Sequence, residues 1–346
     1  MNRTRRIDFD FLRTLIVFSA FVIHFDTRIG LGGVAELSWW IQRYMFTVGG
    51  FFFFTAGYMA NWVYLPRFKA GKAKTSLFLA KKGILILMLY FGYVALMHIS
   101  TSTPLPNIGV NFIFGHSFFA KVLFSFGLLY LIMPPILFVV IKIGNKAVIL
   151  LVVILAAFVA YSPTWNMPDS LRMIVFDRTI EFYPMLSTLI TFSFGFVASV
   201  LDGVLVSRFN SKCLALLSIG LIAVHIGSLM IFPFYRNLLD RRKVLTLVES
   251  LVPYIAVLAV RPFFSIRWVQ DLFERSKILC IGVKSLTFYM ISNVFLGLVL
   301  VPKDSSFLVK FLVFASITSL TYTITYWHWG FSKYHRFVSG GPGSTC

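Results

Sequence analysis

Cysteine and charge are both scarce in this chain of 346 residues. There are three cysteines, Cys213, Cys280 and Cys346, and no CxxC pair occurs. Because their number is odd and their spacing is wide, we predict neither a structural disulfide nor a metal site. Only 13% of the residues are charged, whereas 58% are hydrophobic. A soluble domain has about a quarter charged residues, so the excess apolar surface predicts a protein that is covered by lipid.

Acidic residues are rarer than basic ones. The chain has 13 Asp and Glu against 32 Lys and Arg, which gives a formal net charge of +19. In a soluble protein this imbalance would favour nucleic-acid binding, but the long apolar runs argue against that class. Lys and Arg beside transmembrane helices set orientation and meet anionic headgroups. A few of them could also hold an anionic cosubstrate.

Long apolar stretches recur along the whole chain. A transmembrane helix needs about 20 residues of low polarity, and no soluble domain is inserted between the stretches. We therefore predict an all-α, polytopic helix bundle of about ten transmembrane helices, with one membrane domain over residues 1–335 and a disordered tail over 336–346. The predicted spans are 8–26, 40–64, 79–99, 117–141, 147–161, 183–206, 213–233, 244–262, 278–301 and 307–331.

The connection between the second and third predicted helices is the most basic. It carries Arg67, Lys69, Lys72, Lys74, Lys81 and Lys82. Positive connections face the cytoplasm, and the distribution of Lys and Arg along the chain predicts that both termini are cytoplasmic. Two interpretations of this connection remain open. It is either an orientation signal alone or also a binding surface for the phosphates of an anionic cosubstrate.

The first predicted helix contains three ionisable residues, which are costly inside a membrane and indicate function. Asp10 and Arg13 are three residues apart and can pair on one helix face. His24 follows Arg13 by eleven residues, which is within about 20° of three full turns and about 16 Å along the axis. A neutral imidazole in a polar cavity is a good general base. The alternatives are a snorkelling anchor for Arg13 and an outer-interface residue for His24.

The stretch Asp10-Phe-Leu-Arg13, followed by ten residues and His24, resembles the N-terminal signature of the acyltransferase 3 family. These are bacterial inner-membrane enzymes, many of which O-acetylate cell-surface carbohydrate. Later stretches resemble the family in the same order. They are Phe51-Phe-Phe-Phe-Thr-Ala-Gly57-Tyr, Phe78-Leu-Ala-Lys81-Lys82-Gly, Phe124-Ser-Phe-Gly-Leu-Leu-Tyr130, Phe192-Ser-Phe-Gly195 and Ile281-Gly-Val-Lys-Ser285-Leu-Thr-Phe-Tyr289.

The chain departs from the family pattern at two places. Lys81-Lys82 stand where the family is Arg-rich, and lysine lacks the bidentate fork of arginine. Ser292-Asn293 follow Tyr289-Met-Ile, where the family usually has a histidine. A role carried by that histidine therefore has no counterpart of the same type here.

The resemblance implies a membrane O-acyltransferase that moves an acetyl group from acetyl-CoA to a hydroxyl of a cell-surface glycan or glycolipid. His24 would act as base or acyl carrier, Arg13 would hold the cosubstrate or stabilise negative charge, and Asp10 would fix Arg13. Lys81 and Lys82 would meet the phosphates of CoA. The alternative classes are a transporter or flippase of lipid-linked glycan and a subunit of a polymer-export complex without chemistry of its own. We see no internal repeat of the kind that many transporters have.

Overall fold

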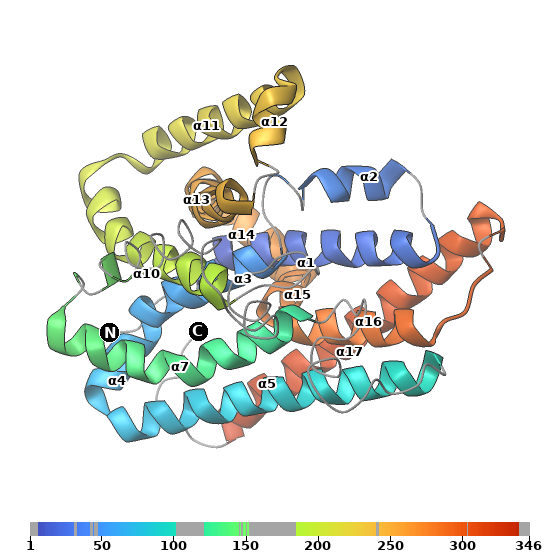
Figure 1. The fold of residues 1–346 in the computed structure, drawn as a ribbon, viewed down its shortest axis with the longest axis horizontal. Coiled ribbons are helices and arrows are strands. Elements are labelled where there is room, and N and C mark those ends of the chain that lie inside the picture. The colour runs from blue at the N-terminus through green and yellow to red at the C-terminus, as the bar shows by residue number, and fades with distance from the viewer. Residues whose placement is uncertain are drawn as a thin grey trace, which may run out of the picture. The chain divides into compact units, whose positions relative to one another are not determined.

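The described part of the chain is helical and contains no strand. The computed structural model describes residues 6–30, 33–41, 44, 48–101, 121–144, 146, 148–149, 151, 185–239, 242–302 and 304–338. The helices (Figure 1) are α1 Ile7–Arg28, α2 Gly33–Trp40, α3 Val48–Met59, the π-helical turn η2 Ala60–Tyr64, α4 Leu65–Ala70, α5 Lys72–Thr101, α7 Lys121–Ile143, α10 Met185–Arg208, α11 Ser211–Ile231, α12 Pro233–Leu239, α13 Arg242–Val260, the 3₁₀ turn η4 Phe263–Ser265, α14 Arg267–Ser276, α15 Leu279–Val283, α16 Ser285–Leu298 and α17 Phe307–Val338.

Five of the described helices are long and apolar enough to cross a membrane. These segments are Lys72–Leu96, Val122–Ile143, Ser187–Leu205, Ser211–Ile231 and Phe307–Gly330. The outward side chains of α11 are apolar as well, and Leu216, Val224 and Met230 are all exposed. Such a surface is unfavourable in water and favourable in hydrocarbon. The chain is therefore a helical membrane protein, and the predicted count of ten spans is not confirmed.

Most described residues of the predicted spans are helical, although the spans 213–233, 244–262 and 278–301 extend one to three residues past a helix end. The segment 147–161 lies almost wholly outside the described residues. Two spans are divided in a way that apolarity does not predict. The span 40–64 passes from α3 into the π-helical turn η2. The span 278–301 is interrupted at Lys284, between α15 and α16. Of the predicted tail, residues 336–338 belong to α17 and the remainder lies outside the described residues.

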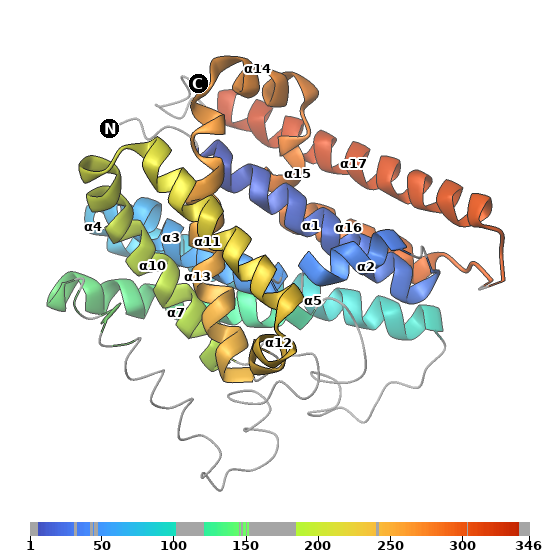
Figure 2. The same ribbon diagram turned by 90° about the horizontal axis from the view of Figure 1, so that it is seen from above.

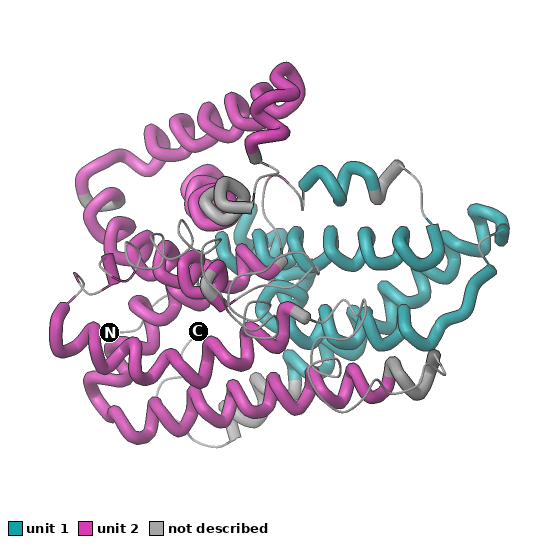
Figure 3. Tube along the Cα trace, in the orientation of Figure 1, with its two compact units in different colours: residues 1–43, 260–346 teal, residues 44–259 magenta. Residues whose placement is uncertain are grey.

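The chain divides into two compact units (Figure 3). Unit 1 comprises residues 1–43 and 260–346, and unit 2 comprises residues 44–259. Unit 1 therefore joins α1 and α2 to α14, α15, α16 and α17, the last four helices that the structure describes. Unit 2 contains the middle of the sequence.

Two glycines allow a close helix crossing in unit 2. A Cβ on Gly57 of α3 would lie 1.8 Å from the carbonyl oxygen of Phe192 on α10, and a Cβ on Gly195 would lie 1.9 Å from that of Phe54. The two contacts are reciprocal, so α3 and α10 cross backbone against backbone. Small residues allow this approach in membrane helices, where close packing replaces the hydrophobic drive between helices.

In unit 1, α1 and the α15–α16 pair lie side by side and run in the same direction (Figures 1 and 2). The direction follows from three contacts along α1, at Asp10 with Gly282, at His24 with Asn293 and at Arg28 with Gly297. Aromatic rings join this pair to α17. Phe21 stacks on Phe314 at 5.2 Å between ring centroids and meets Phe288 edge-on at 6.2 Å.

Candidate active site

Asp10 and Arg13 form an ion pair in the second turn of α1. Arg13 Nη1 lies 3.7 Å from Asp10 Oδ1, and the two side chains are 20% and 10% exposed. The pairing predicted from their spacing is confirmed. Arg13 Nε is also buried and donates no hydrogen bond to any described group. A buried donor without an acceptor is costly, so this guanidinium has capacity left for an anionic ligand.

The backbone around Asp10 is packed directly against α15. A Cβ on Gly282 would lie 1.8 Å from the Asp10 carbonyl oxygen and 2.7 Å from Thr14 Oγ1. The Thr14 hydroxyl donates to the same carbonyl at 2.9 Å. Gly282 is thus the residue that lets α15 reach the start of α1, and this contact holds the Asp10–Arg13 pair at a defined place in unit 1.

His24 is bound to an amide on a distant helix. Its Nδ1 lies 2.8 Å from Asn293 Oδ1 on α16. The amide nitrogen of Asn293 donates to the Tyr289 carbonyl at 2.7 Å, which leaves the amide oxygen to face the imidazole. An amide oxygen only accepts, so Nδ1 carries the proton in this contact. In the neutral ring Nε2 then bears the lone pair, which is the tautomer that a general base requires.

Asn293 is a site residue that sequence reasoning missed. It is 1% exposed, and it stands in the stretch where the family resemblance lacks its usual histidine. Tyr289, one turn earlier, places its ring edge-on to His24 with 5.8 Å between centroids. The sequence does contain one signal for Asn293, which is an amide within an apolar helix. Such a group needs hydrogen-bond partners when it is buried. Its partner could not be identified from sequence.

A second hydrogen bond between α1 and α16 lies one turn beyond His24. Arg28 Nη2 donates to the Gly297 carbonyl at 2.9 Å. Arg28 follows His24 by four residues, as Gly297 follows Asn293, so the two contacts repeat along the same pair of faces. The α1 helix therefore contacts α15 before His24 and α16 after it, and these contacts hold the imidazole in place.

Lys81 and Lys82, which were predicted to act together on phosphate, have different surroundings in unit 2. Lys82 donates to the Tyr130 hydroxyl at 2.8 Å, and its ammonium lies 4.4 Å from the centroid of that ring. Lys81 is exposed, with no hydrogen bond or ion pair to a described residue. Of the two lysines, Lys81 is therefore the one whose charge is exposed and unpaired within the described part of the chain.

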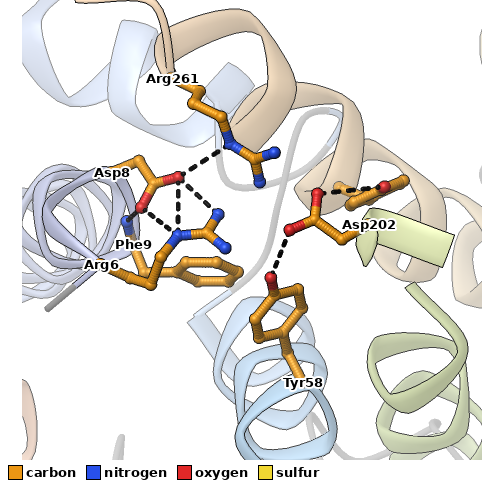
Figure 4. Close-up of polar contacts among 7 residues, drawn as sticks. Arg6, Asp8, Phe9, Tyr58, Asp202 and Arg261 are labelled. Atoms are coloured by element: carbon orange, nitrogen blue, oxygen red, sulfur yellow. Dashed lines mark hydrogen bonds and ion pairs between the residues drawn. The ribbon is translucent and has the colours of Figure 1, made fainter. Parts of the chain in front are cut away.

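Three further buried carboxylates, Asp8, Asp202 and Glu249, were not singled out from sequence, and Figure 4 shows the first two. Asp8, in unit 1, accepts from Arg6 Nη2 at 2.7 Å and faces Arg261 Nε at 3.5 Å. Asp202, in unit 2, accepts from the Tyr58 hydroxyl at 2.6 Å and from the Tyr254 hydroxyl at 3.5 Å. A buried carboxylate with such partners avoids the cost of an isolated charge. Both networks are explained as structural.

No described group of three or more His, Cys, Asp and Glu side chains is arranged to hold a metal ion. Cys213 and Cys280 are free thiols, the first exposed and the second buried. Compared with family models, with curated proteins and with solved structures, the chain has no match. The functional argument therefore depends on the geometry of α1 and on the resemblance of its signature.

Proposed function

We propose that the protein is a membrane O-acyltransferase that moves an acetyl group from acetyl-CoA to a hydroxyl of a cell-surface glycan or glycolipid. The observation that carries the proposal is the hydrogen bond between His24 Nδ1 and Asn293 Oδ1 at 2.8 Å. It orients the imidazole and selects the tautomer with a basic Nε2. The chemistry of acyl transfer needs such a base, because a sugar hydroxyl is a weak nucleophile until its proton is removed.

The proposed reaction has one proton carrier. His24 Nε2 takes the proton of the acceptor hydroxyl as the hydroxyl oxygen attacks the thioester carbonyl carbon. The tetrahedral intermediate then expels the CoA thiolate with cleavage of the carbon–sulfur bond, and the imidazolium returns its proton to that sulfur. The products are the acyl ester and free CoA, and the imidazole is neutral again.

Arg13 is assigned to the cosubstrate and not to the reacting carbonyl. Eleven residues separate it from His24, which is about 16 Å along α1, too far for one guanidinium to touch a carbonyl beside the imidazole. The pantetheine arm of CoA holds the diphosphate well away from the thioester. An arginine with an unsatisfied buried Nε fits an anionic group at the far end of that arm. Asp10 orients this guanidinium. The exposed Lys81 of unit 2 is a separate proposal for a cation that binds a donor phosphate.

The topology belongs to the same proposal. Ten spans with both termini in the cytoplasm would give a bacterial inner-membrane enzyme in which Arg13 lies near the cytoplasmic end of α1. The donor then enters from the cytoplasm, where acetyl-CoA is made. His24, three turns further along, lies toward the outer side, where the glycan acceptor is found.

Mass spectrometry of host surface glycans tests the proposal. Glycans from cells that express the chain should carry an added acetyl mass, and cells without the chain should lack it. The purified protein should also release CoA from acetyl-CoA, a reaction that a flippase does not perform. An unchanged glycan mass together with no CoA release would contradict the proposed function.

A further inference from the structure

α14 is a short helix that packs apolar side chains against unit 1 on one side and exposes apolar side chains on the other. It lies at the end of unit 1 where α1 begins. Its ten residues, Arg267–Ser276, span about 15 Å, half the thickness of a bilayer core. It therefore cannot cross a membrane. The function of its exposed face is independent of the acyltransfer proposed above.

The inner side of α14 fixes the helix to unit 1. Val269 is buried, and the ring of Phe273 lies 5.3 Å from Phe11 of α1 and 5.4 Å from Phe264. The Gln270 amide also donates to the Phe264 carbonyl. These contacts leave one orientation for the helix, so its other side must face outward.

The outward side presents a large apolar surface. Trp268 and Leu272 are four residues apart and share one face, and they are 66% and 56% exposed. Phe263 and Ile266, just before the helix, are exposed too. An exposed apolar patch of this kind indicates an interaction site. A short amphipathic helix with Trp and Leu on one face and charges beside them is typical of a helix that lies in a membrane interface.

Contacts of α14 with α1 and α17 place it beside the C-terminal part of the membrane-crossing segment of α17. Phe11 stands in the second turn of α1, and the Tyr322 hydroxyl donates to the Ser276 carbonyl at 3.5 Å. Tyr322 lies inside the membrane-crossing segment Phe307–Gly330 of α17. Its ring stacks on Tyr326, which meets Trp329 at 5.8 Å, and such aromatic groups mark membrane interfaces. Figure 2 shows α14 across this end of unit 1, where α1 starts and α17 ends.

Two cations lie beside the exposed apolar face that Trp268 and Leu272 form. Arg275 follows Trp268 by seven residues and so lies within about 20° of it around the helix, and Lys277 ends the helix with a left-handed φ of 56°. Both are exposed and form no ion pair with a described residue. Residues 267–277 carry three cations against Asp271 and Glu274. Asp271 is about 60° from Trp268 around the helix.

We propose that this outward face of α14 binds an anionic phospholipid of the adjacent leaflet, with Trp268 and Leu272 among the acyl chains and Arg275 and Lys277 on the headgroup phosphate. The positive-inside bias makes this the cytoplasmic leaflet. Anionic headgroups attract each nearby Lys or Arg, and guanidinium forms charge-assisted hydrogen bonds to phosphate. The lipid covers the apolar patch and neutralises the two cations together.

The test uses the full chain in nanodiscs of phosphatidylcholine that contain an equal minor fraction of brominated phosphatidylglycerol or brominated phosphatidylcholine. The fluorescence of Trp268 is obtained as the difference between the wild type and Trp268→Phe. The brominated anionic lipid should quench Trp268 several-fold more than the brominated zwitterionic lipid. In the double variant Arg275→Gln and Lys277→Gln the preference should fall to near equality.

The double variant Lys69→Gln and Lys74→Gln is the matched control, because it removes two exposed lysines of unit 2. It should keep the preference at Trp268. Equal quenching by the two lipids in the wild type would overturn headgroup binding. Access of aqueous iodide to Trp268 without quenching by either lipid would overturn the membrane assignment, and would mean that water or a protein partner covers this face.

Discussion

His24 and Asn293, 269 residues apart in the chain, are joined by a hydrogen bond of 2.8 Å between Nδ1 and Oδ1. The bond connects the first helix to the α16 helix and fixes both the plane and the tautomer of the imidazole. Asn293 is itself held by the Tyr289 carbonyl, so the acceptor oxygen cannot rotate away without losing a second bond. The arrangement holds the imidazole in one orientation, as the proposed role of a base requires.

Replacing Asn293 should impair His24 without removing it. Asn293→Leu leaves Nδ1 without its acceptor, so the ring can rotate and populate the other tautomer. Misplacement of a catalytic group by about 1 Å costs about 10²-fold in rate, and we expect a loss of that size in acyl transfer. Asn293→Asp keeps an acceptor oxygen at the same position and should retain more of the rate.

The readout that separates positioning from folding is ¹⁵N NMR of the labelled histidine. The wild type should show His24 protonated at Nδ1, and Asn293→Leu should show a mixture of tautomers. If Asn293→Leu transferred acyl groups at the wild-type rate, or kept a single Nδ1-protonated tautomer, the positioning role of Asn293 would be wrong.

The two lysines of α5 should respond differently to substitution. Lys81→Ala removes an exposed charge and should weaken acetyl-CoA binding about tenfold or more, the range of a charged hydrogen bond, with unchanged thermal unfolding. Lys82→Met removes the ammonium bound to Tyr130 and should lower stability by about 1–2 kcal/mol. Calorimetric titration and thermal unfolding in detergent measure the two effects. Unchanged affinity in Lys81→Ala would reduce this residue to an orientation signal.

Gly282→Ala should destabilise the packing of α15 on α1. The added Cβ would stand 1.8 Å from the Asp10 carbonyl oxygen, so the helices must separate, at a cost of about 1–3 kcal/mol. Gly220→Ala on α11 is the matched control, because nothing lies within 4 Å of its Cβ position. Alanine there should be neutral or stabilise the helix by up to about 1 kcal/mol. Equal unfolding midpoints for the two variants in mixed micelles would contradict the close contact.

Much of the helical fold could be predicted from apolarity and length, because each span is a local property of its own residues. The interruption at Lys284 and the π-helical turn Ala60–Tyr64 could not. Neither follows from the apolarity and length of its own segment. The glycines of Thr55-Ala56-Gly57 and Phe192-Ser-Phe-Gly195 were recognised as motifs, but only the structure shows that Gly57 and Gly195 meet in one crossing.

The candidate site, too, could be predicted only in part from the sequence. Asp10 and Arg13 are three residues apart on one helix, so their ion pair could be predicted from spacing alone. Asn293 is far from His24 in the sequence, so spacing could not predict their contact. It also stands in a stretch where the family pattern has a histidine, so its own role could not be inferred from the resemblance. The unlike surroundings of Lys81 and Lys82 were also hidden, because they follow from Tyr130 on α7.

The most direct test of the account is acyl transfer by His24→Ala. The measurement is acetyl incorporation into the glycan, normalised to folded protein in the membrane, with His225→Ala as the matched control. The His225 ring is held by the Tyr235 hydroxyl and the Tyr44 carbonyl, so its loss should affect stability and leave transfer per folded molecule unchanged. Removal of a general base lowers rates by about 10²–10⁴-fold, and we predict a loss in this range for His24→Ala alone. Transfer near the wild-type rate in folded His24→Ala would contradict the catalytic assignment and the proposed acyltransferase with it.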